Sequence, residues 1–242
     1  MRDVRDVGRR QVPASPCLIE IAGVAGAGKS TLSAALCCAE GRYQRGPFIR
    51  TRAPSHLVYV LRGLPRLLPV LVANAARPPR MSWPDVKLMA YITGWRDFLT
   101  RRYGSSDSAV VLDQGPIYAL VRLKAQGRGV AASHPFQRWW NDMLAQWLRT
   151  LSVIVWLDAP DDVLRARIDA RAQAHTVKGT AADVGQRFIT RYRELFDDVL
   201  RTVELSDPPR VLRFDTADTP VEQLVTDVRA ILESEPDPSC GP

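Results

Sequence analysis

Short apolar runs alternate with longer amphipathic stretches along most of this 242-residue chain. Five runs have the length and composition of buried strands, and they cover residues 17–22, 48–51, 109–113, 152–158 and 211–215. Between them, apolar residues recur at three- and four-residue spacing, which is typical of helices with one buried face. This alternation predicts an α/β fold, a doubly wound parallel five-stranded sheet with helices on both faces.

Several expected helices carry start signals or strong periodicity. Ser82 has the character of an N-cap and Asp85 lies three positions later, so we expect a helix to begin there. A capping box at 219–222 predicts the closing helix. Apolar faces also repeat at helical spacing within 136–148 and 188–203. The tryptophans at this spacing are predicted to be core residues rather than a platform for stacking bases.

The composition is that of an ordinary soluble protein, with 46% hydrophobic and 24% charged residues. We expect one domain over 16–234, with loose polar tails at 1–15 and 235–242. Residues 1–15 lack a signal-type apolar region, which predicts a cytoplasmic protein. The four cysteines show no C-x-x-C spacing, so free thiols are expected.

The net charge of +7 comes mainly from arginines. These are scattered, with no block of five or six consecutive basic residues. Basic residues that are scattered along the chain favour small anionic partners over nucleic acid, so no nucleic-acid partner is expected.

The strongest local pattern is the segment Gly-Val-Ala-Gly-Ala-Gly-Lys-Ser-Thr at 23–31, which fits G-x-x-x-x-G-K-[ST] at every defined position. An apolar run precedes it and a helical pattern follows it, which is the context of a phosphate-binding loop. Glycines let backbone N–H groups close around phosphate oxygens, and the following helix adds its positive end. The pattern predicts ATP and Mg²⁺ as cofactors. The residues expected to bind them are Gly23, Ala25, Gly26, Ala27, Gly28, Lys29, Ser30 and Thr31.

Two residues of this loop have individual roles. Lys29 is expected to reach the outer phosphates and to be catalytic, and the Ser30 hydroxyl is expected to hold Mg²⁺. Asp113 ends a buried apolar run, where the carboxyl end of a parallel strand faces an active site. It is predicted to be catalytic, either by orienting Mg²⁺-bound water or by accepting a proton. Capping of the following turn is the structural alternative for this carboxylate.

A second segment reads Leu-Asp-Ala-Pro at 157–160 and Leu-Arg-Ala-Arg-Ile-Asp-Ala-Arg at 164–171. With the phosphate loop, it makes the chain resemble the P-loop kinases of nucleosides and nucleotides over about residues 17–233, with thymidylate kinase closest in layout. The resemblance implies a mobile lid at about 168–184, with Arg167 against the adenine and Arg171 touching phosphates. The i, i+4 spacing places both arginines on one helix face, and a merely solvated face is the alternative.

The chain departs from this family at two points that concern the acceptor. Gln114 follows Asp113 where the family often has arginine, and Arg52-Ala53-Pro54 stands where it often has Arg-Glu-Pro. Arg52 and Gln114 are the expected substrate-binding residues, and the identity of the acceptor stays open. The loop at 215–218 matches the family's adenine edge.

The predicted function is therefore an ATP-dependent kinase that transfers the γ-phosphoryl group to a small-molecule acceptor, such as a nucleoside or nucleotide. The acceptor would be held by the insertion 50–108. A regulatory NTPase that transfers phosphate only to water is the rival function, and the long insertion favours the kinase. The oligomeric state stays open, with a homodimer among the options.

Residues 57–76 form the longest apolar stretch, about the length of a membrane span. Arg62 and Arg66 would be costly at mid-bilayer, and two prolines interrupt the segment. We therefore expect no membrane span but two short helices on the acceptor side, with Arg52, Arg62 or Arg66 facing an anionic acceptor. An apolar acceptor groove or a peripheral membrane contact is the other interpretation.

Overall fold

The computed structural model describes residues 16–38, 42–47, 54–76, 78, 80–104, 106, 108–126, 128–172, 177–205 and 209–234. The strands are β1 (Leu18–Gly23), β2 (Tyr43–Arg45), β3 (Ala109–Asp113), β4 (Val153–Asp158) and β5 (Arg210–Asp215). The helices are α1 (Lys29–Cys38), α2 (Pro54–Ala76), α3 (Trp83–Tyr103), α4 (Pro116–Gln126), α5 (Arg128–Ala131), α6 (His134–Leu148), α7 (Asp161–Ala170), α8 (Ala182–Glu204) and α9 (Val221–Ser234). The expected tails at 1–15 and 235–242 lie outside the described residues.

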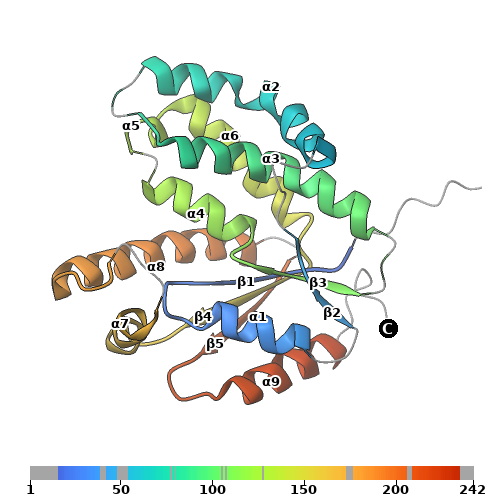
Figure 1. Ribbon diagram of the computed structural model, residues 1–242, viewed down its shortest axis with the longest axis vertical. Coiled ribbons are helices and arrows are strands. Elements are labelled where there is room, and N and C mark those ends of the chain that lie inside the picture. The colour runs from blue at the N-terminus through green and yellow to red at the C-terminus, as the bar shows by residue number, and fades with distance from the viewer. Residues whose placement is uncertain are drawn as a thin grey trace, which may run out of the picture.

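The five strands form one parallel sheet in the order β2-β3-β1-β4-β5. Central β1 is buried along its whole length, with Ile19 level with Val111 of β3 and Val153 of β4. Helices α1 and α9 cover one face, and α4 and α8 cover the other, with α2, α3 and α6 stacked beyond α4 (Figure 1). The predicted doubly wound parallel five-stranded sheet is confirmed.

The second strand does not lie where the apolar pattern placed it. The expected strand at 48–51 falls outside the described residues, and β2 is found at Tyr43–Arg45. Only Tyr43 of this edge strand is buried, and it pairs with Ala109. Because a short edge strand needs so little apolar surface, the sequence pattern carries almost no signal for it.

The helices that the sequence signals predicted are present, and the Ser82 cap is confirmed. The Ser82 hydroxyl accepts a hydrogen bond from the Asp85 backbone N–H at 3.3 Å and caps α3. Trp95 of α3 and Trp147 of α6 are buried and meet edge to face at 5.9 Å between ring centroids. These tryptophans fill the core between the helical layers, as the spacing predicted.

The prediction of two short helices within 57–76 is wrong, because α2 runs unbroken from Pro54 to Ala76 with Pro65 and Pro69 inside it. Proline removes the hydrogen bond to the carbonyl four residues earlier. Those carbonyls belong to Leu61 and Pro65, which are exposed, so water can satisfy them. Over Leu57–Ala76 this described helix is long and apolar enough to cross a membrane by length and composition alone, and 17% of its apolar window is buried in the domain.

The cysteines only partly follow the expectation of free thiols. Cys37 and Cys38 of α1 are free. Cys17, directly before β1, is disulfide-bonded, which the sequence spacing did not indicate.

Candidate active site

The phosphate loop joins the carboxyl end of β1 to the amino end of α1, as the sequence predicted. Gly26 and Gly28 adopt φ values of +89° and +86°, which favour glycine over residues with a Cβ. A Cβ added at Gly28 would meet nothing within 4 Å, so this part of the loop faces open space. The helix end and the loop N–H groups together suit a bound phosphate.

This loop borders a cavity of about 810 Å³. Ten of the predicted site residues line the cavity, namely Ala25, Gly26, Ala27, Gly28, Lys29, Ser30, Thr31, Gln114, Arg167 and Arg171, whereas Asp113 is not among the lining residues. Sequence reasoning missed Leu32, Tyr118, Thr219, Val221 and Leu224. Gly23 ends β1 behind the loop, and Arg52 lies outside the described residues. The cavity therefore joins the loop to the start of α9.

Lys29 is almost fully buried at the floor of the site. Its Nζ donates a hydrogen bond to the Val24 carbonyl at 2.7 Å and lies 5.7 Å from the centroid of the Tyr118 ring. Burial lowers the pKa of Lys29 to about 8, the negative charge of Asp113 raises it, and the positive charge of Arg171 lowers it further. Asp113 and Arg171 are therefore both close enough to Lys29 for their charges to act on it.

Asp113 is the last residue of β3 and is partly buried. Its Oδ1 is shielded from solvent and has no hydrogen-bond partner among the residues that the structure describes. A buried carboxylate oxygen without a partner is costly and suits a metal ion, a bound water or a ligand proton. No group of three or more His, Cys, Asp or Glu side chains that could hold a metal occurs in the described part of the chain. Mg²⁺ in nucleotide sites uses only one or two protein oxygens besides phosphate and water.

The two arginines of the expected lid reach the cavity in different ways. Arg167 lies on α7 and forks onto the β5–α9 connection, with Nη1 3.0 Å from the Thr216 hydroxyl and Nη2 2.7 Å from the Thr216 carbonyl. Arg171 is the C-cap of α7 and has extended backbone angles. Arg171 thus lies one residue beyond the last residue of α7, and both arginines line the same cavity.

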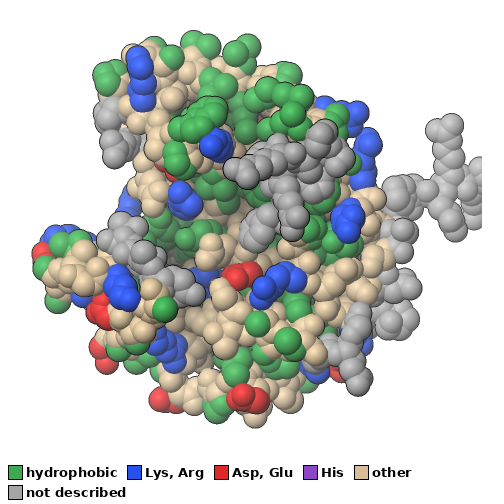
Figure 2. Space-filling view, in the orientation of Figure 1, with side chains coloured by type: hydrophobic (Ala, Val, Ile, Leu, Met, Phe, Trp, Pro, Cys, Tyr) green, Lys and Arg blue, Asp and Glu red, His purple; other side chains and the backbone are tan. Residues whose placement is uncertain are grey.

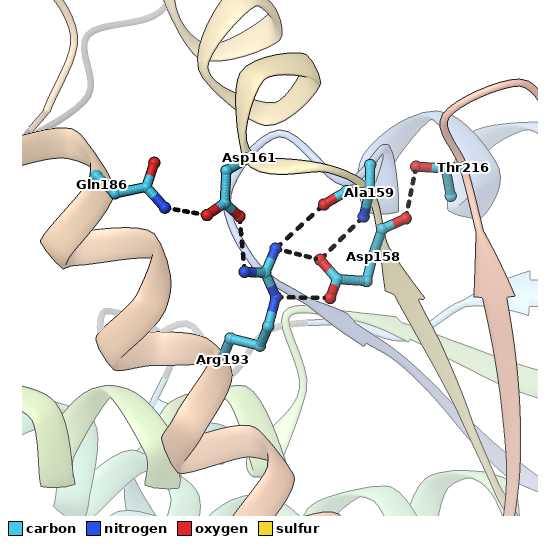
Figure 3. Close-up of polar contacts among 6 residues, drawn as sticks. All are labelled: Asp158, Ala159, Asp161, Gln186, Arg193 and Thr216. Atoms are coloured by element: carbon cyan, nitrogen blue, oxygen red, sulfur yellow. Dashed lines mark hydrogen bonds and ion pairs between the residues drawn. The ribbon is translucent and has the colours of Figure 1, made fainter. Parts of the chain in front are cut away.

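A network that the sequence did not reveal fixes the elements around these arginines (Figure 3). Arg193 of α8 donates through Nε to Asp158 at 2.7 Å, pairs through Nη1 with Asp161 at 2.6 Å and reaches the Ala159 carbonyl at 3.1 Å. These contacts raise the pKa of Arg193 above its ordinary value, with the Asp158 hydrogen bond the largest cause. Thr216 donates its hydroxyl to the Asp158 carbonyl at 3.1 Å, so β4, α7, α8 and β5 meet here. Among many arginines on an amphipathic helix, Arg193 had no distinguishing signal.

Glu20 was also missed, although a carboxylate inside the apolar run of β1 was a usable signal. It is fully buried, and its two oxygens accept hydrogen bonds from the backbone N–H groups of Ile117 and Tyr118, each at 2.9 Å. Burial raises the pKa of Glu20 to about 8, against the lowering effect of these two bonds. The carboxyl group thus caps α4 and supports the turn in which Gln114 adopts a φ of +56°.

Comparisons with known proteins show a likeness of fold. No model of a known protein family matches the sequence, and no curated protein sequence matches it. The structure is similar to deoxyadenosine kinase from M. mycoides with bound dCTP, with a TM-score of 0.53 and 15% identity over 90% of this chain and 100% of that one. It is similar to thymidylate kinase from Candida albicans, with a TM-score of 0.55 and 14% identity over 91% of this chain and 92% of that one. With its phosphate loop beside a parallel β2-β3-β1-β4-β5 sheet, the chain has a nucleotide kinase-like fold.

Proposed function

We propose that this protein is an ATP-dependent phosphotransferase that acts on a small-molecule acceptor. The observation that carries the proposal is that buried Lys29 and Arg171 line the same cavity beside the phosphate loop, with the charge of Asp113 acting on Lys29. A buried cation, a carboxylate with an unpartnered oxygen and a second cation are the groups that phosphoryl transfer requires around its transferring group.

The cavity has room for a nucleotide laid from the loop towards α9. The phosphates would lie on the loop N–H groups with Lys29 at their outer end. The base would lie at the other end, where Arg167, Thr216, Thr219 and Leu224 offer a cation, polar groups and an apolar side chain. Arginine is suited to stacking on a base, although here Arg167 also holds the β5–α9 connection.

The residues present fit Mg²⁺ as the accompanying ion. The exposed Ser30 hydroxyl at the start of α1 and the Asp113 carboxylate would hold it, the latter directly or through water. When bound, the ion would neutralise charge on the phosphate oxygens.

The side chains of this protein would then contribute mainly position and charge. Lys29 would hold the outer phosphate in place, and Arg171 would meet the charge that develops on the transferring group. We propose that the segment 168–184, which carries Arg171, closes over the cavity as a lid and excludes water. Asp113 is assigned to the phosphate side of the site because its charge acts on Lys29.

For the acceptor we propose a nucleoside or nucleotide. The support is the fold, which is shared with kinases of both kinds, one of them described with bound dATP. Gln114 and Tyr118 line the cavity on the side of α4 and would face the acceptor. Arg52 remains a predicted acceptor-binding residue.

The test is a screen of ATP consumption and ADP release over nucleosides, nucleotides and sugars, with the Lys29→Met variant as the inactive reference. Lys87→Met makes the same change at an exposed position and should behave as the wild-type protein. We expect consumption that depends on one class of acceptor and is lost in Lys29→Met. ATP hydrolysis at the same rate with and without every acceptor would contradict the kinase and favour an NTPase.

A further inference from the structure

The outer side of α2 carries a line of exposed large apolar side chains. The α2 stripe consists of Leu57, Leu61, Leu64, Leu68 and Val72, spaced by four, three, four and four residues, so its members stack along one side of the helix. Leu61, Leu68 and Val72 are 52%, 61% and 62% exposed. Hydrophobic side chains gather over this end of the molecule (Figure 2). A contiguous apolar line of this kind marks an interaction surface.

The stripe is not the side by which α2 joins the domain. That side is formed by Gly63, Leu67 and Val70, which are all buried. A Cβ at Gly63 would meet the Thr93 side chain at 2.8 Å, and one at Gly94 of α3 would meet the Tyr59 carbonyl at 2.4 Å. The two helices therefore lie close together, and α2 is docked with its apolar stripe turned outward.

The segment that contains α2 is strongly one-sided in charge. Residues 41–84 include eight arginines and no aspartate or glutamate, although the whole chain has a net charge of only +7. Among the described arginines of this segment, Arg45, Arg62, Arg66 and Arg80 are exposed, and the last three lie in α2 or shortly after it. Trp83, just beyond α2, is 66% exposed and adds an amphipathic ring of the type found at membrane–water boundaries.

A cleft on the flank of α2 extends this basic surface. It has a volume of about 300 Å³ and lies between α2 and α6. Arg66, His134 and Arg138 line it, with Asp142 as the single acidic residue among its lining side chains. The flank thus offers cationic groups next to the apolar stripe.

We infer that α2 is a docking surface for an anionic lipid bilayer, on which the helix lies in the plane of the interface with its stripe among the acyl chains and its arginines among the headgroups. Apolar area and basic charge on one surface are the two attractions that such helices use. A second copy of the chain fits less well, because two-fold pairing through α2 would bring arginine-rich segments together with no acidic residue in 41–84 to pair with them. This inference does not depend on the proposed kinase activity.

The experiment is flotation of the full chain with vesicles of phosphatidylcholine, with and without about 30% phosphatidylserine, at physiological and high salt. We expect binding only to the anionic vesicles, and weaker binding at high salt because the arginine contribution is screened. The double variant Leu61→Asn/Leu68→Asn should bind about tenfold or more weakly, because it removes apolar contacts from the stripe. Leu205→Asn, at a 91% exposed leucine outside α2, is the matched control and should bind as the wild type does.

The oligomeric state of the same proteins is measured by analytical ultracentrifugation without lipid. Far-ultraviolet circular dichroism checks the fold of the double variant, which we expect to be retained because both leucines are exposed. Failure to float with anionic vesicles, or equal binding by the double variant, would overturn the inference. So would a wild-type dimer that the double variant converts to a monomer, since a second copy would then be the occupant of the stripe.

Discussion

Replacing Lys29 by methionine should separate the stability of this protein from its activity. Burial displaces the pKa of Lys29 from 10.5 to about 8, which means that the folded site disfavours the charged lysine. This displacement corresponds to a cost of about 3 kcal/mol for keeping the lysine charged at neutral pH. Methionine has a similar length and no charge, so Lys29→Met removes this cost.

The gain in stability is reduced by the contacts that the lysine makes. Methionine cannot donate to the Val24 carbonyl, and that hydrogen bond to a charged group contributes about 1.5 kcal/mol or somewhat more. We therefore expect Lys29→Met to be more stable than the wild type at pH 7 by about 1 kcal/mol, while its phosphoryl transfer is lost.

The assay is urea unfolding at several pH values, alongside turnover with ATP and the acceptor found in the screen. The sign of the pH dependence follows from the lowered pKa of Lys29. The free-energy cost of the charged lysine is fully present below about pH 8 and disappears as pH rises towards 10.5. Between these pH values Lys29 is neutral in the folded protein but still protonated in the unfolded chain, so the wild type gains stability as pH rises. The advantage of the variant should shrink over that range. A variant that is less stable than the wild type at pH 7, or one that keeps wild-type turnover, would refute the reasoning.

Four further substitutions test the remaining site residues. Asp113→Asn keeps the shape but removes the charge, so turnover should fall about a hundredfold or more and recover in part with added Mg²⁺; unchanged activity would leave only a structural role. Arg171→Ala should lower kcat about tenfold or more with little effect on ATP affinity. Arg167→Ala should mainly raise the KM for ATP. Unaltered kinetics in both variants would contradict the roles assigned to these arginines. Glu20→Gln removes a carboxyl group whose pKa burial raises to about 8. Relative to this variant, the wild type should therefore lose free energy of unfolding as pH rises from about 4.5 to 8. A stability difference that does not change with pH would contradict the raised pKa.

The sequence predicted the fold wherever structure follows from periodicity. The apolar runs that became β1, β3, β4 and β5 are long and buried, so their composition marks them. The β2 strand lies at the sheet edge with one buried residue, and nothing in its three residues distinguishes it from a loop. For α2 the two prolines misled the prediction, because a helix can keep its course through proline where water reaches the freed carbonyls.

The candidate site likewise has a part that the sequence predicts and a part that only the structure reveals. The phosphate loop was predictable because its chemistry is local, and nine consecutive residues carry all of it. Tyr118 and Leu224 come from elements far from the loop in sequence, and only the three-dimensional fold brings them to its cavity. Arg193 is likewise far in sequence from Asp158, which it meets only in the fold. Glu20 could have been found, because an acidic residue in a fully buried strand needs hydrogen-bond partners, and helix N–H groups can supply them.

Some buried charged side chains of this protein are paired with other side chains and hold the structure together, whereas others lack such a partner and are available to a ligand. Arg193 is paired with Asp158 and Asp161 and also bonds a carbonyl, so its charge is compensated within the protein and serves to join α8 to β4 and α7. Lys29 is more buried, yet its described hydrogen-bond acceptor is a neutral carbonyl, and the Oδ1 of nearby Asp113 has no described partner. Folding alone does not reward this arrangement, because uncompensated buried charge costs free energy. Bound phosphate and Mg²⁺ would supply the missing negative charge to Lys29 and the missing positive charge to Asp113. We therefore expect ATP with Mg²⁺ to raise the unfolding temperature of the wild type, and to raise it much less in Lys29→Met, whereas an equal shift in both proteins would place the nucleotide elsewhere.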